Sequence, residues 1–467
     1  MHRLSLSIVL FTFISCVQNT NIKPEFIPCD TLTGWENESG ERCGYLTVPE
    51  NHYKPDGRKI KIAFAIKKGS NDASGIPTIY LTGGPGEPAL SIKQRFYRDD
   101  LLSIGDVILL DQRGMGLSTP LERLDQIIIG ILAQDLTMEQ ERLEVIRTMR
   151  DMKKQLISEG IDLSMYNTIQ NARDVGALMN ALGYKQYNLW GGSYGTKLGA
   201  YVMKYFPEKI HAAALTAPAT LNNTALVSRI PDFTNALEAL INKCPNDPDC
   251  ANKHPDLRSD ILMVLNELES DPVTISLVDR PFTINPQDAV FLIRYLLYRS
   301  NGDQLVSQFI IALKEKNIEA LQNLSSNAYA VIQQINLTAF YSFEAYEEFG
   351  PSTIDDLNQA ISKSEIVSIA GLAWFQSFIP ALGEWHSGRV TNEENELKNI
   401  QVPTVVIANA FDPSTPSKYA LMFDQAIDPC YIINLKKFGH GAFGPCMAKI
   451  RREFLQDPNK PIDEECD

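Results

Sequence analysis

Ser193 lies in the segment GGSYG (191–195), which follows the apolar run YNLW and precedes a helical pattern. A G-x-S-x-G segment between a strand and a helix is typical of a sharp turn that exposes the serine hydroxyl. Such a turn places the hydroxyl at the N-terminus of the helix, where the helix dipole favours developing negative charge. The glycines let neighbouring backbone approach the turn without a clash with a Cβ atom. The sequence therefore predicts Ser193 as a nucleophile.

A serine hydroxyl needs a general base, which is itself oriented by a carboxylate. Two later segments supply these groups. His440 lies in FGHG (438–441) and Asp412 lies in NAFDPSTP (409–416), and each segment follows a predicted strand. Other interpretations stay open, with Asp412 as an Asx-turn residue and His440 as an ordinary loop histidine. We predict that Ser193, Asp412 and His440 form a triad.

Backbone N–H groups for a developing oxyanion are expected in two places. TGGPG (82–86) follows the predicted strand PTIYL, so its N–H groups are candidates to face a carbonyl oxygen beside Ser193. The second donor is the N–H of Tyr194, the residue after the nucleophile. A Gly-Gly-Pro-Gly segment also occurs as a simple turn, and this alternative stays open.

Short β-branched runs followed by turn residues indicate the strands that position these segments. The predicted strands are 59–66, 77–81, 106–110, 187–190, 212–215, 403–408 and 431–435. Helical patterns, such as 171–182 and 196–206, lie between several of them. Strands that alternate with helices predict an α/β fold with a mostly parallel sheet flanked by helices.

The alternation stops near residue 220 and resumes at Pro403. The sequence between is largely helical, for example at 303–315 and 317–335, with a hairpin pattern at 273–284. An insertion between two parts of one sheet predicts a large helical cap, inserted after the sixth strand. We therefore divide the chain into a signal peptide (1–15), a tether (16–28), a first core part (29–220), the cap (221–398) and a second core part (399–467).

Five motifs in this order resemble the proline iminopeptidase and tripeptidyl aminopeptidase family of α/β-hydrolases, including exported members with a TAP-like C-terminal region. The motifs are GGPG (83–86), DQRGMGLS (111–118), GGSYG (191–195), FDPSTP (411–416) and GHG (439–441). The order Ser, acid, His is also that of the α/β-hydrolases. The resemblance implies the α/β-hydrolase fold, the triad named above, and Gly84 with Tyr194 as the oxyanion hole. Asp111 and Arg113 are expected to be scaffold residues that pair with each other or with nearby backbone.

Family members that accept free N-termini hold the substrate's ammonium group with cap carboxylates. SFEAYEEF (342–349) resembles a family segment of the form S-V-x-C-x-E, which aligns Glu347 with such a carboxylate. Ala345 and Leu382 stand where the family has two cysteines, so that bridge is missing. TAPA (216–219) stands where relatives often have Asp-Gly. The other interpretation of Glu347 is a solvated helix glutamate.

The resemblance implies a serine exopeptidase that hydrolyses amide bonds near the free N-terminus of peptides, of prolyl or tripeptidyl type, through an acyl-enzyme. A carboxylesterase or lipase with the same triad is one alternative, because fold and triad do not fix the acyl substrate. GGPG in place of the HGGG type disfavours it. A catalytically inactive surface binding protein is the other alternative, and the complete triad argues against it. The chemistry implies no metal and no organic cofactor, and peptides with a free N-terminus are the expected partners.

The composition of the 467 residues is globular, with 44% hydrophobic and 21% charged residues. The formal net charge of −14 repels phosphate backbones, which argues against a nucleic-acid partner.

Residues 1–16, MHRLSLSIVLFTFISC, indicate export, because Arg3 precedes an apolar run too short to span a bilayer. The small residue before Cys16 resembles a bacterial lipobox, which implies lipidation of Cys16. A signal that is simply cleaved stays open. The expected location is the periplasm or cell surface of a bacterium, with membrane association through the lipid only.

The other seven cysteines show no spacing typical of a metal site, and disulfides are expected in an exported chain. Sequence proximity favours Cys29–Cys43 and Cys244–Cys250. Cys430, Cys446 and Cys466 allow one more bridge, for which we expect Cys446–Cys466.

Overall fold

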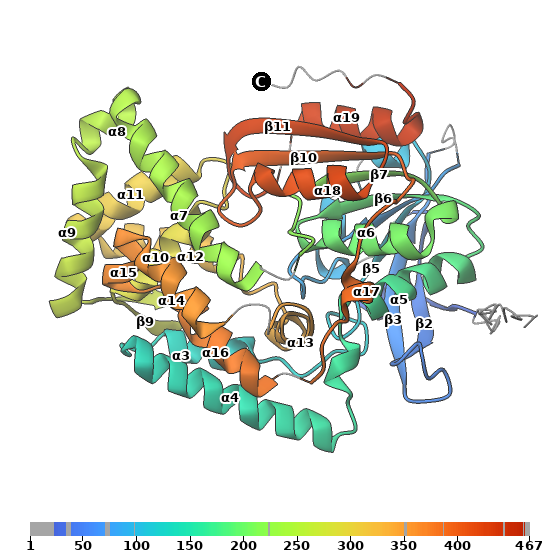
Figure 1. The fold of residues 1–467 in the computed structure, drawn as a ribbon, viewed down its shortest axis with the longest axis horizontal. Helices are drawn as coiled ribbons and strands as arrows, with labels where there is room; N and C mark the ends of the chain where they lie inside the picture. Colours follow the sequence, from blue (N-terminus) through green and yellow to red (C-terminus); the bar gives the residue numbers. More distant parts are fainter. Residues whose placement is uncertain are drawn as a thin grey trace, which may run out of the picture.

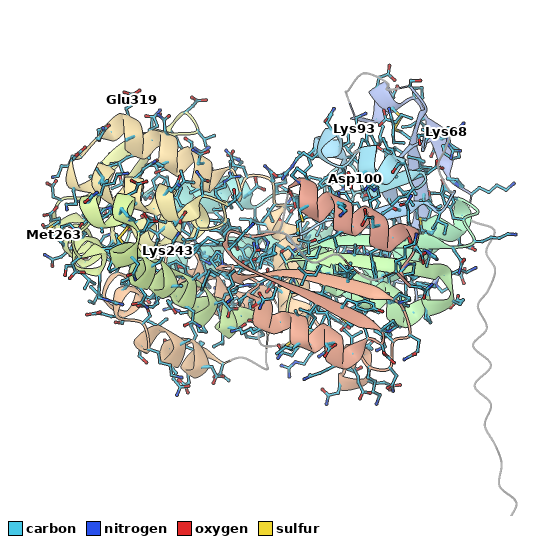
Figure 2. The ribbon with its side chains drawn as sticks, turned by 90° about the horizontal axis from the view of Figure 1, so that it is seen from above. Lys68, Lys93, Asp100, Lys243, Met263 and Glu319 are labelled. Atoms are coloured by element: carbon cyan, nitrogen blue, oxygen red, sulfur yellow. A yellow bond between two sulfur atoms is a disulfide. The ribbon has the colours of Figure 1, made fainter. Side chains whose placement is uncertain are left out.

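The computed structural model describes residues 23–33, 39–70, 75–97, 99–222, 225–349, 353–385, 387–441, 444–460 and 462. The predicted signal peptide and Cys16 lie outside these residues. The described chain forms two lobes, one built around a large sheet and one mainly helical (Figure 1). Figure 2 shows the same two lobes from above, with Glu319 and Lys243 on the helical lobe and Lys93 and Asp100 on the sheet lobe.

The sheet has nine strands in the order β1-β2-β3-β5-β4-β6-β7-β10-β11. The strands from β5 to β11 in this order pair in parallel, whereas β1, β2 and β3 pair antiparallel. Their bounds are β1 (Glu25–Ile27), β2 (Glu41–Pro49), β3 (Lys59–Lys67), β4 (Thr78–Leu81), β5 (Val107–Leu110), β6 (Tyr187–Gly192), β7 (Ile210–Thr216), β10 (Thr404–Phe411) and β11 (Cys430–Phe438). The sheet is therefore mostly parallel, as the alternating pattern predicts.

Helices cover both faces of the sheet, which is why its central strands are apolar on both sides. On β4, Ile79 and Leu81 join the core cluster that contains residues of α5 (Thr168–Ala181), α6 (Tyr194–Tyr205) and α18 (Ala420–Ala426). Tyr80 points to the other face and joins a second cluster with α2 (Asp99–Leu102) and α19 (Pro445–Gln456). α18 and α19 lie on opposite sides of β10 and β11 in Figure 1.

The chemistry-bearing segments follow neighbouring parallel strands. The glycine segment 83–86 comes after β4, Ser193 after β6, Asp412 directly after β10 and His440 two residues after β11. Parallel strands bring their carboxyl ends to one edge of a sheet, where ligands of open α/β sheets bind. One edge therefore gathers all four segments.

Most of the helical lobe lies between β7 and β10. Its elements are α7 (Ala225–Lys243), α8 (Pro248–Lys253), α9 (Leu257–Ser270), the hairpin β8 (Val273–Leu277) and β9 (Arg280–Ile284), α10 (Pro286–Leu296), α11 (Gly302–Lys314), α12 (Ile318–Tyr329), α13 (Leu337–Glu347), α14 (Ile354–Ser362), α15 (Glu365–Ala370) and α16 (Phe375–Trp385). The insertion follows β7, which is the sixth strand when the three-residue edge strand β1 is not counted. α13, seen end-on near the centre of Figure 1, lies between the two lobes.

A second insertion also belongs to the helical lobe. α3 (Asp125–Leu132) and α4 (Met138–Ser158), which our sequence division placed in the core, lie beside α16 (Figure 1). Glu141 on α4 is buried and accepts hydrogen bonds from Trp374 N, Ser377 Oγ and Gln287 Nε2, so it holds α4 on the cap. Conversely, α17 (Asn392–Asn395) lies within the predicted cap range but contacts the sheet lobe. Tyr201 Oη on α6 donates a hydrogen bond of 3.0 Å to Asn395 Oδ1.

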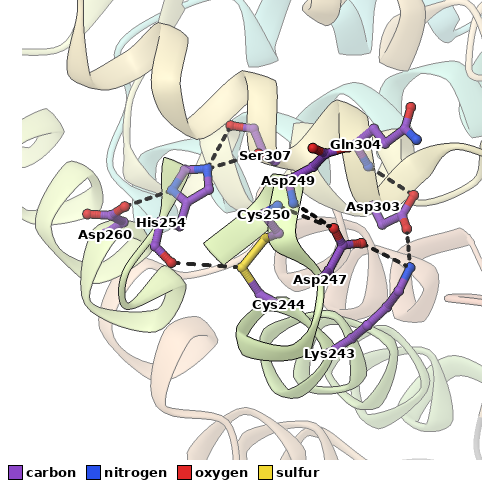
Figure 3. Close-up of a disulfide and its surroundings, with 10 residues drawn as sticks. All are labelled: Lys243, Cys244, Asp247, Asp249, Cys250, His254, Asp260, Asp303, Gln304 and Ser307. Atoms are coloured by element: carbon purple, nitrogen blue, oxygen red, sulfur yellow. Dashed lines mark hydrogen bonds and ion pairs between the residues drawn. A yellow bond between two sulfur atoms is a disulfide. The ribbon is translucent and has the colours of Figure 1, made fainter. Parts of the chain in front are cut away.

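Two of the predicted disulfides are confirmed, Cys29–Cys43 and Cys244–Cys250. Figure 3 shows the second, which ties the end of α7 to α8. Cys446 is disulfide-bonded, but its predicted partner Cys466 lies outside the described residues, so that pairing stays a prediction; Cys430 has a free thiol. The two bridges indicate an oxidising, exported environment. Among the helices described, none combines the length and the apolar character needed to cross a bilayer.

Candidate active site

Ser193 occupies a strained turn between β6 and α6. Its backbone has φ 53° and ψ −125°, a region that non-glycine residues rarely adopt. Two hydrogen bonds hold the turn, from Ser193 N to Thr216 O (3.0 Å) and from Thr196 N to Ser193 O (2.9 Å). A Cβ atom on Gly195 would lie 2.0 Å from the backbone oxygen of Leu81, so this position requires glycine. The local geometry is that expected of a nucleophile elbow.

The carboxylate of Asp412 is bonded to the imidazole of His440. Its two oxygens lie 2.9 and 3.1 Å from His440 Nδ1. Asp412 also accepts hydrogen bonds from Ser414 N, Thr415 N and Thr415 Oγ1, at 2.8 to 2.9 Å. Burial alone would raise the pKa of Asp412, but His440 and these hydrogen bonds lower it below its usual value. An ionised carboxylate in this position orients the ring and stabilises an imidazolium.

The loop of His440 is fixed by the core and by the cap. Asn409 Nδ2 donates to the backbone oxygens of Gly439 and Gly441, at 2.9 and 3.0 Å. On the other side His440 N donates to Tyr298 O, and the Tyr298 ring lies 4.8 Å from the imidazole. Tyr298 follows helix α10, so the cap takes part in placing the histidine.

Gly84 and Tyr194, the two predicted oxyanion donors, both line the pocket that contains Ser193. Gly84 has φ +106°, and a Cβ atom there would lie 2.6 Å from Gly86 N. Only glycine therefore fits this turn. The Tyr194 side chain is directed away from the reaction, because its hydroxyl lies 2.9 Å from Thr168 Oγ1 in a buried position. The backbone N–H of Tyr194 is therefore the group that could act as the predicted oxyanion donor.

The pocket around Ser193 lies between the two lobes and has a volume of about 60 Å³. The core contributes Ser193, Gly84 and Thr415, and the cap contributes α7 and α13. Thr415 connects this pocket to the Asp412–His440 pair, because its hydroxyl donates to Asp412 and lies 3.3 Å from His440 Nδ1. All of the predicted triad therefore belongs to one region.

Five charged side chains line the pocket, namely Glu344, Glu347, Glu348 and Arg229 from the cap and Lys197 from α6. Arg229 binds Glu344 with two nitrogens, at 2.7 and 2.9 Å, and Lys197 Nζ lies 3.0 Å from Glu347 and 2.8 Å from Glu348. Burial alone would lower the pKa of Lys197, but Glu348 and Glu347 raise it well above its usual value. Burial raises the pKa of Glu348, and Lys197 opposes that rise.

Glu347, the predicted substrate ligand, is 6% exposed, so the alternative of a solvated helix glutamate is wrong. Besides Lys197, it accepts a hydrogen bond from Thr168 N at 2.5 Å. The pocket as a whole holds three carboxylates and two cations among its lining residues. By formal charge, the carboxylates therefore outnumber the cations by one.

Several residues at the site were not predicted. Lys197 and Arg229 are ordinary helix cations in the sequence, and only the fold shows that they face the cap carboxylates. Asn409 lies three residues before Asp412, at the start of the segment 409–416 that the sequence predicts to hold the acid. Arg113 was expected to pair with Asp111 or with backbone; it binds Asp174 and the backbone oxygens of Glu50 and Met165.

Comparisons with known proteins agree with the geometry. Residues 77–252 match the family described as alpha/beta hydrolase fold, and residues 373–466 match the family described as TAP-like protein. The α/β-hydrolase fold expected from the motifs is thereby confirmed.

Among similar proteins, a tripeptidyl aminopeptidase of Streptomyces lividans is 28% identical over 192 residues, which are 39% of this chain and 36% of that protein. The chain thus spans about a third of the length of that relative. YuaR of Escherichia coli, named only as a hydrolase, is 24% identical over 87% of this chain and 84% of its own length. A solved proline iminopeptidase of Mycobacterium smegmatis is 15% identical, with 89% and 93% of the two chains covered and a TM-score of 0.37.

Proposed function

Because the chain belongs to the α/β-hydrolase family and contains a TAP-like region, we propose that it is an exported serine exopeptidase acting near the free N-terminus of peptides. The observation that supports this most directly is the position of Ser193, at a strained elbow that opens into a pocket lined by three cap carboxylates and two cations. The elbow supplies a nucleophile, and the excess carboxylate suits a substrate with a positive charge close to the scissile bond.

In the proposed mechanism His440 removes the proton of Ser193 as the serine oxygen attacks the scissile carbonyl. The N–H groups of Gly84 and Tyr194 stabilise the oxyanion, and Asp412 stabilises the imidazolium. His440 then donates the proton to the leaving amine, and water releases the acyl-enzyme by the same route. The bond between Asp412 and His440 Nδ1 supports this assignment of roles.

The pocket charges support recognition of an ammonium group. Each pocket cation is already bound to a carboxylate, Arg229 to Glu344 and Lys197 to Glu347 and Glu348. A substrate ammonium that enters this space balances the formal excess of one carboxylate, whereas an acetylated N-terminus brings no charge to balance it. A buried charge without a partner is costly, so the ammonium is favoured.

A small panel of substrates tests this proposal. Fluorogenic Pro-, Ala- and Ala-Ala-Pro-amides, each with a free and an acetylated N-terminus, are compared with a short-chain ester. We expect the free amides to be cleaved with much higher kcat/KM than the acetylated ones. Equal rates on both would contradict recognition of the amine, and fast ester cleavage without amide cleavage would favour a carboxylesterase. Failure of a fluorophosphonate probe to label Ser193 would favour a binding protein.

Glu347→Gln tests the proposed role of Glu347 as a substrate ligand. The amide oxygen keeps the acceptor for Thr168 N while the charge is removed. We expect KM for free-amine peptides to rise about tenfold, the usual effect of losing one charged hydrogen bond, with ester hydrolysis nearly unchanged. The exposed Glu319→Gln is the matched control. Unchanged peptide kinetics in Glu347→Gln would remove this residue from the substrate site.

The proposal includes export and a lipid anchor at Cys16, and both disulfides support the exported location. When the chain is expressed in bacteria, labelled palmitate should be incorporated into the wild type and not into the Cys16→Ser variant. Equal labelling of both chains, or of neither, would contradict the anchor.

A further inference from the structure

Three polar side chains of the cap form a chain of hydrogen bonds that is separate from Ser193. His254 Nδ1 lies 2.7 Å from Asp260 Oδ2, and His254 Nε2 lies 2.9 Å from Ser307 Oγ. Figure 3 shows the imidazole between the carboxylate and the hydroxyl. His254 follows α8, Asp260 lies in the first turn of α9, and Ser307 lies on α11. Serine, histidine and aspartate thus meet in the arrangement that activates a serine hydroxyl.

The carboxylate determines which nitrogen of His254 carries the proton. Burial alone would raise the pKa of Asp260, but Lys314 and His254 lower it below its usual value. The ionised carboxylate has no proton to donate, so His254 Nδ1 donates to it. In a neutral ring Nε2 is then an acceptor, and the hydroxyl of Ser307 donates the bond of 2.9 Å. The proton of Ser307 therefore already points at a base.

The loop closed by the disulfide Cys244–Cys250 holds His254 in place. His254 N donates to Cys250 O at 2.8 Å, and Cys244 Sγ lies 4.0 Å from His254 O. The imidazole itself is fully buried. On the other side Lys314 Nζ lies 2.8 Å from Asp260 Oδ1 and fixes the carboxylate. Base and acid are thus both held by contacts outside the three residues.

Ser307 lines a pocket of about 210 Å³ beside the disulfide, which is larger than the pocket around Ser193. The charged residues of its lining are three aspartates and two lysines, namely Asp247, Asp249, Asp303, Lys243 and Lys253. Lys243 is bound to Asp303, whereas the exposed Lys253 has no bonded partner among the side chains that the structure describes. An ammonium group next to the base is therefore available for a developing oxyanion. The charged lining suits a small polar molecule.

We propose that Ser307, His254 and Asp260 form a second hydrolytic site, which takes small polar esters. His254 removes the proton of Ser307 as Oγ bonds to the carbonyl carbon of the ester, and Lys253 stabilises the oxyanion. When the ester C–O bond breaks, His254 gives this proton to the departing alcohol. Water then gives a proton to His254 and attacks the acyl carbon, Ser307 Oγ leaves with that proton, and the carboxylic acid is released. The backbone oxygen of Ser307, 3.3 Å from Nε2, accepts from the imidazolium during these steps.

Labelling with diisopropyl fluorophosphate tests this site, because the reagent is small and requires only an activated serine. We expect Ser193→Ala to take up one diisopropylphosphoryl group per chain, located at Ser307 by intact mass and peptide mapping. The double variant Ser193→Ala/Ser307→Ala should take up none. A Ser193→Ala chain that stays unlabelled would overturn the proposal and leave the three side chains as a link between cap helices. A wild-type chain labelled at Ser307 alone would contradict only the function proposed for Ser193.

A second variant distinguishes a catalytic role of the three residues from a structural one. In the Ser193→Ala background, Asp260→Asn no longer stabilises the imidazolium, so labelling of Ser307 should slow by about 10³-fold. Asp279→Asn, at an exposed aspartate in the turn between β8 and β9, is the matched control and should be labelled at the rate of its Ser193→Ala parent. Equal labelling rates of these two variants would overturn the proposal.

Hydrolysis of methyl lactate, followed by titration of the released acid, tests turnover at the same site. Ser193→Ala should release acid faster than the double variant Ser193→Ala/Ser307→Ala, because only Ser307 differs between them. Equal rates in the two chains would overturn the hydrolytic role of Ser307. The same pair of variants separates the ester activity of Ser307 from that of Ser193.

Discussion

Two carboxylates of the candidate site, Asp412 and Glu347, are held in different ways. Asp412 receives its hydrogen bonds from Ser414 and Thr415, two and three residues further along the chain. Glu347 receives its backbone hydrogen bond from Thr168, 179 residues away, and its charge partner Lys197 lies on another helix. The loop that contains Asp412 supplies these hydrogen bonds by itself, whereas the contacts of Glu347 exist only when both lobes are in place.

The two environments also differ in charge balance. In the proposed mechanism Asp412 needs one cation, the imidazolium that forms beside it. Glu347 and Glu348 share Lys197 permanently, and both are nearly buried. We therefore expect changes at Asp412 to affect turnover and changes in the cap cluster to affect stability.

The largest effect is expected for Asp412→Asn. The neutral amide no longer stabilises the imidazolium and favours the wrong tautomer of His440, so kcat should fall by roughly 10⁴-fold. The unfolding free energy should change little, since the amide oxygen can still accept the hydrogen bonds from Ser414 N and Thr415 N. Steady-state kinetics and urea denaturation of the same preparations provide the two measurements. Asp151→Asn, on the exposed face of α4, is the control, and a variant that retains a tenth of wild-type kcat would contradict the orienting role.

The contrast also explains which parts of the fold could be predicted from the sequence. Strand 187–190 and the turn after it are defined by adjacent residues, and they correspond to β6 and the Ser193 elbow. The predicted helices 303–315 and 317–335 begin within one residue of α11 and α12 for the same reason, although α12 ends earlier, at Tyr329. Local spacing of apolar residues was sufficient in each case.

What could not be predicted depends on contacts between distant segments. α4 has an amphipathic pattern that fits a core helix as well as a cap helix, and only the bonds from Glu141 to residues 287, 374 and 377 settle its place. Lys197 lies on a predicted helix, where a lysine is normally solvated. Its burial follows from two glutamates on α13 and just after it, which no local pattern shows.

A smaller effect, on stability, is expected for Lys197→Met. The methionine fills a similar volume but leaves Glu347 and Glu348 buried without their cation, which should cost about 3–5 kcal/mol of unfolding free energy at pH 8. Urea denaturation against the wild type measures the loss. Lys154→Met, which removes a lysine with a 71% exposed side chain, is the matched control and should stay close to the wild type.

The loss in Lys197→Met should depend on pH with a definite sign. Burial already raises the pKa of Glu348 against the opposing effect of Lys197, and removal of the lysine raises it further. A carboxyl whose pKa is raised on folding holds its proton to higher pH in the folded state. As pH rises from the unfolded pKa to the folded pKa, this group increasingly destabilises the folded state, and below the unfolded pKa it has no effect on stability. The difference from the wild type should therefore shrink at pH 5 and grow toward pH 8. A pH-independent loss would mean that Lys197 contributes packing and not charge, and that Asp412 and Glu347 differ less than their contacts indicate.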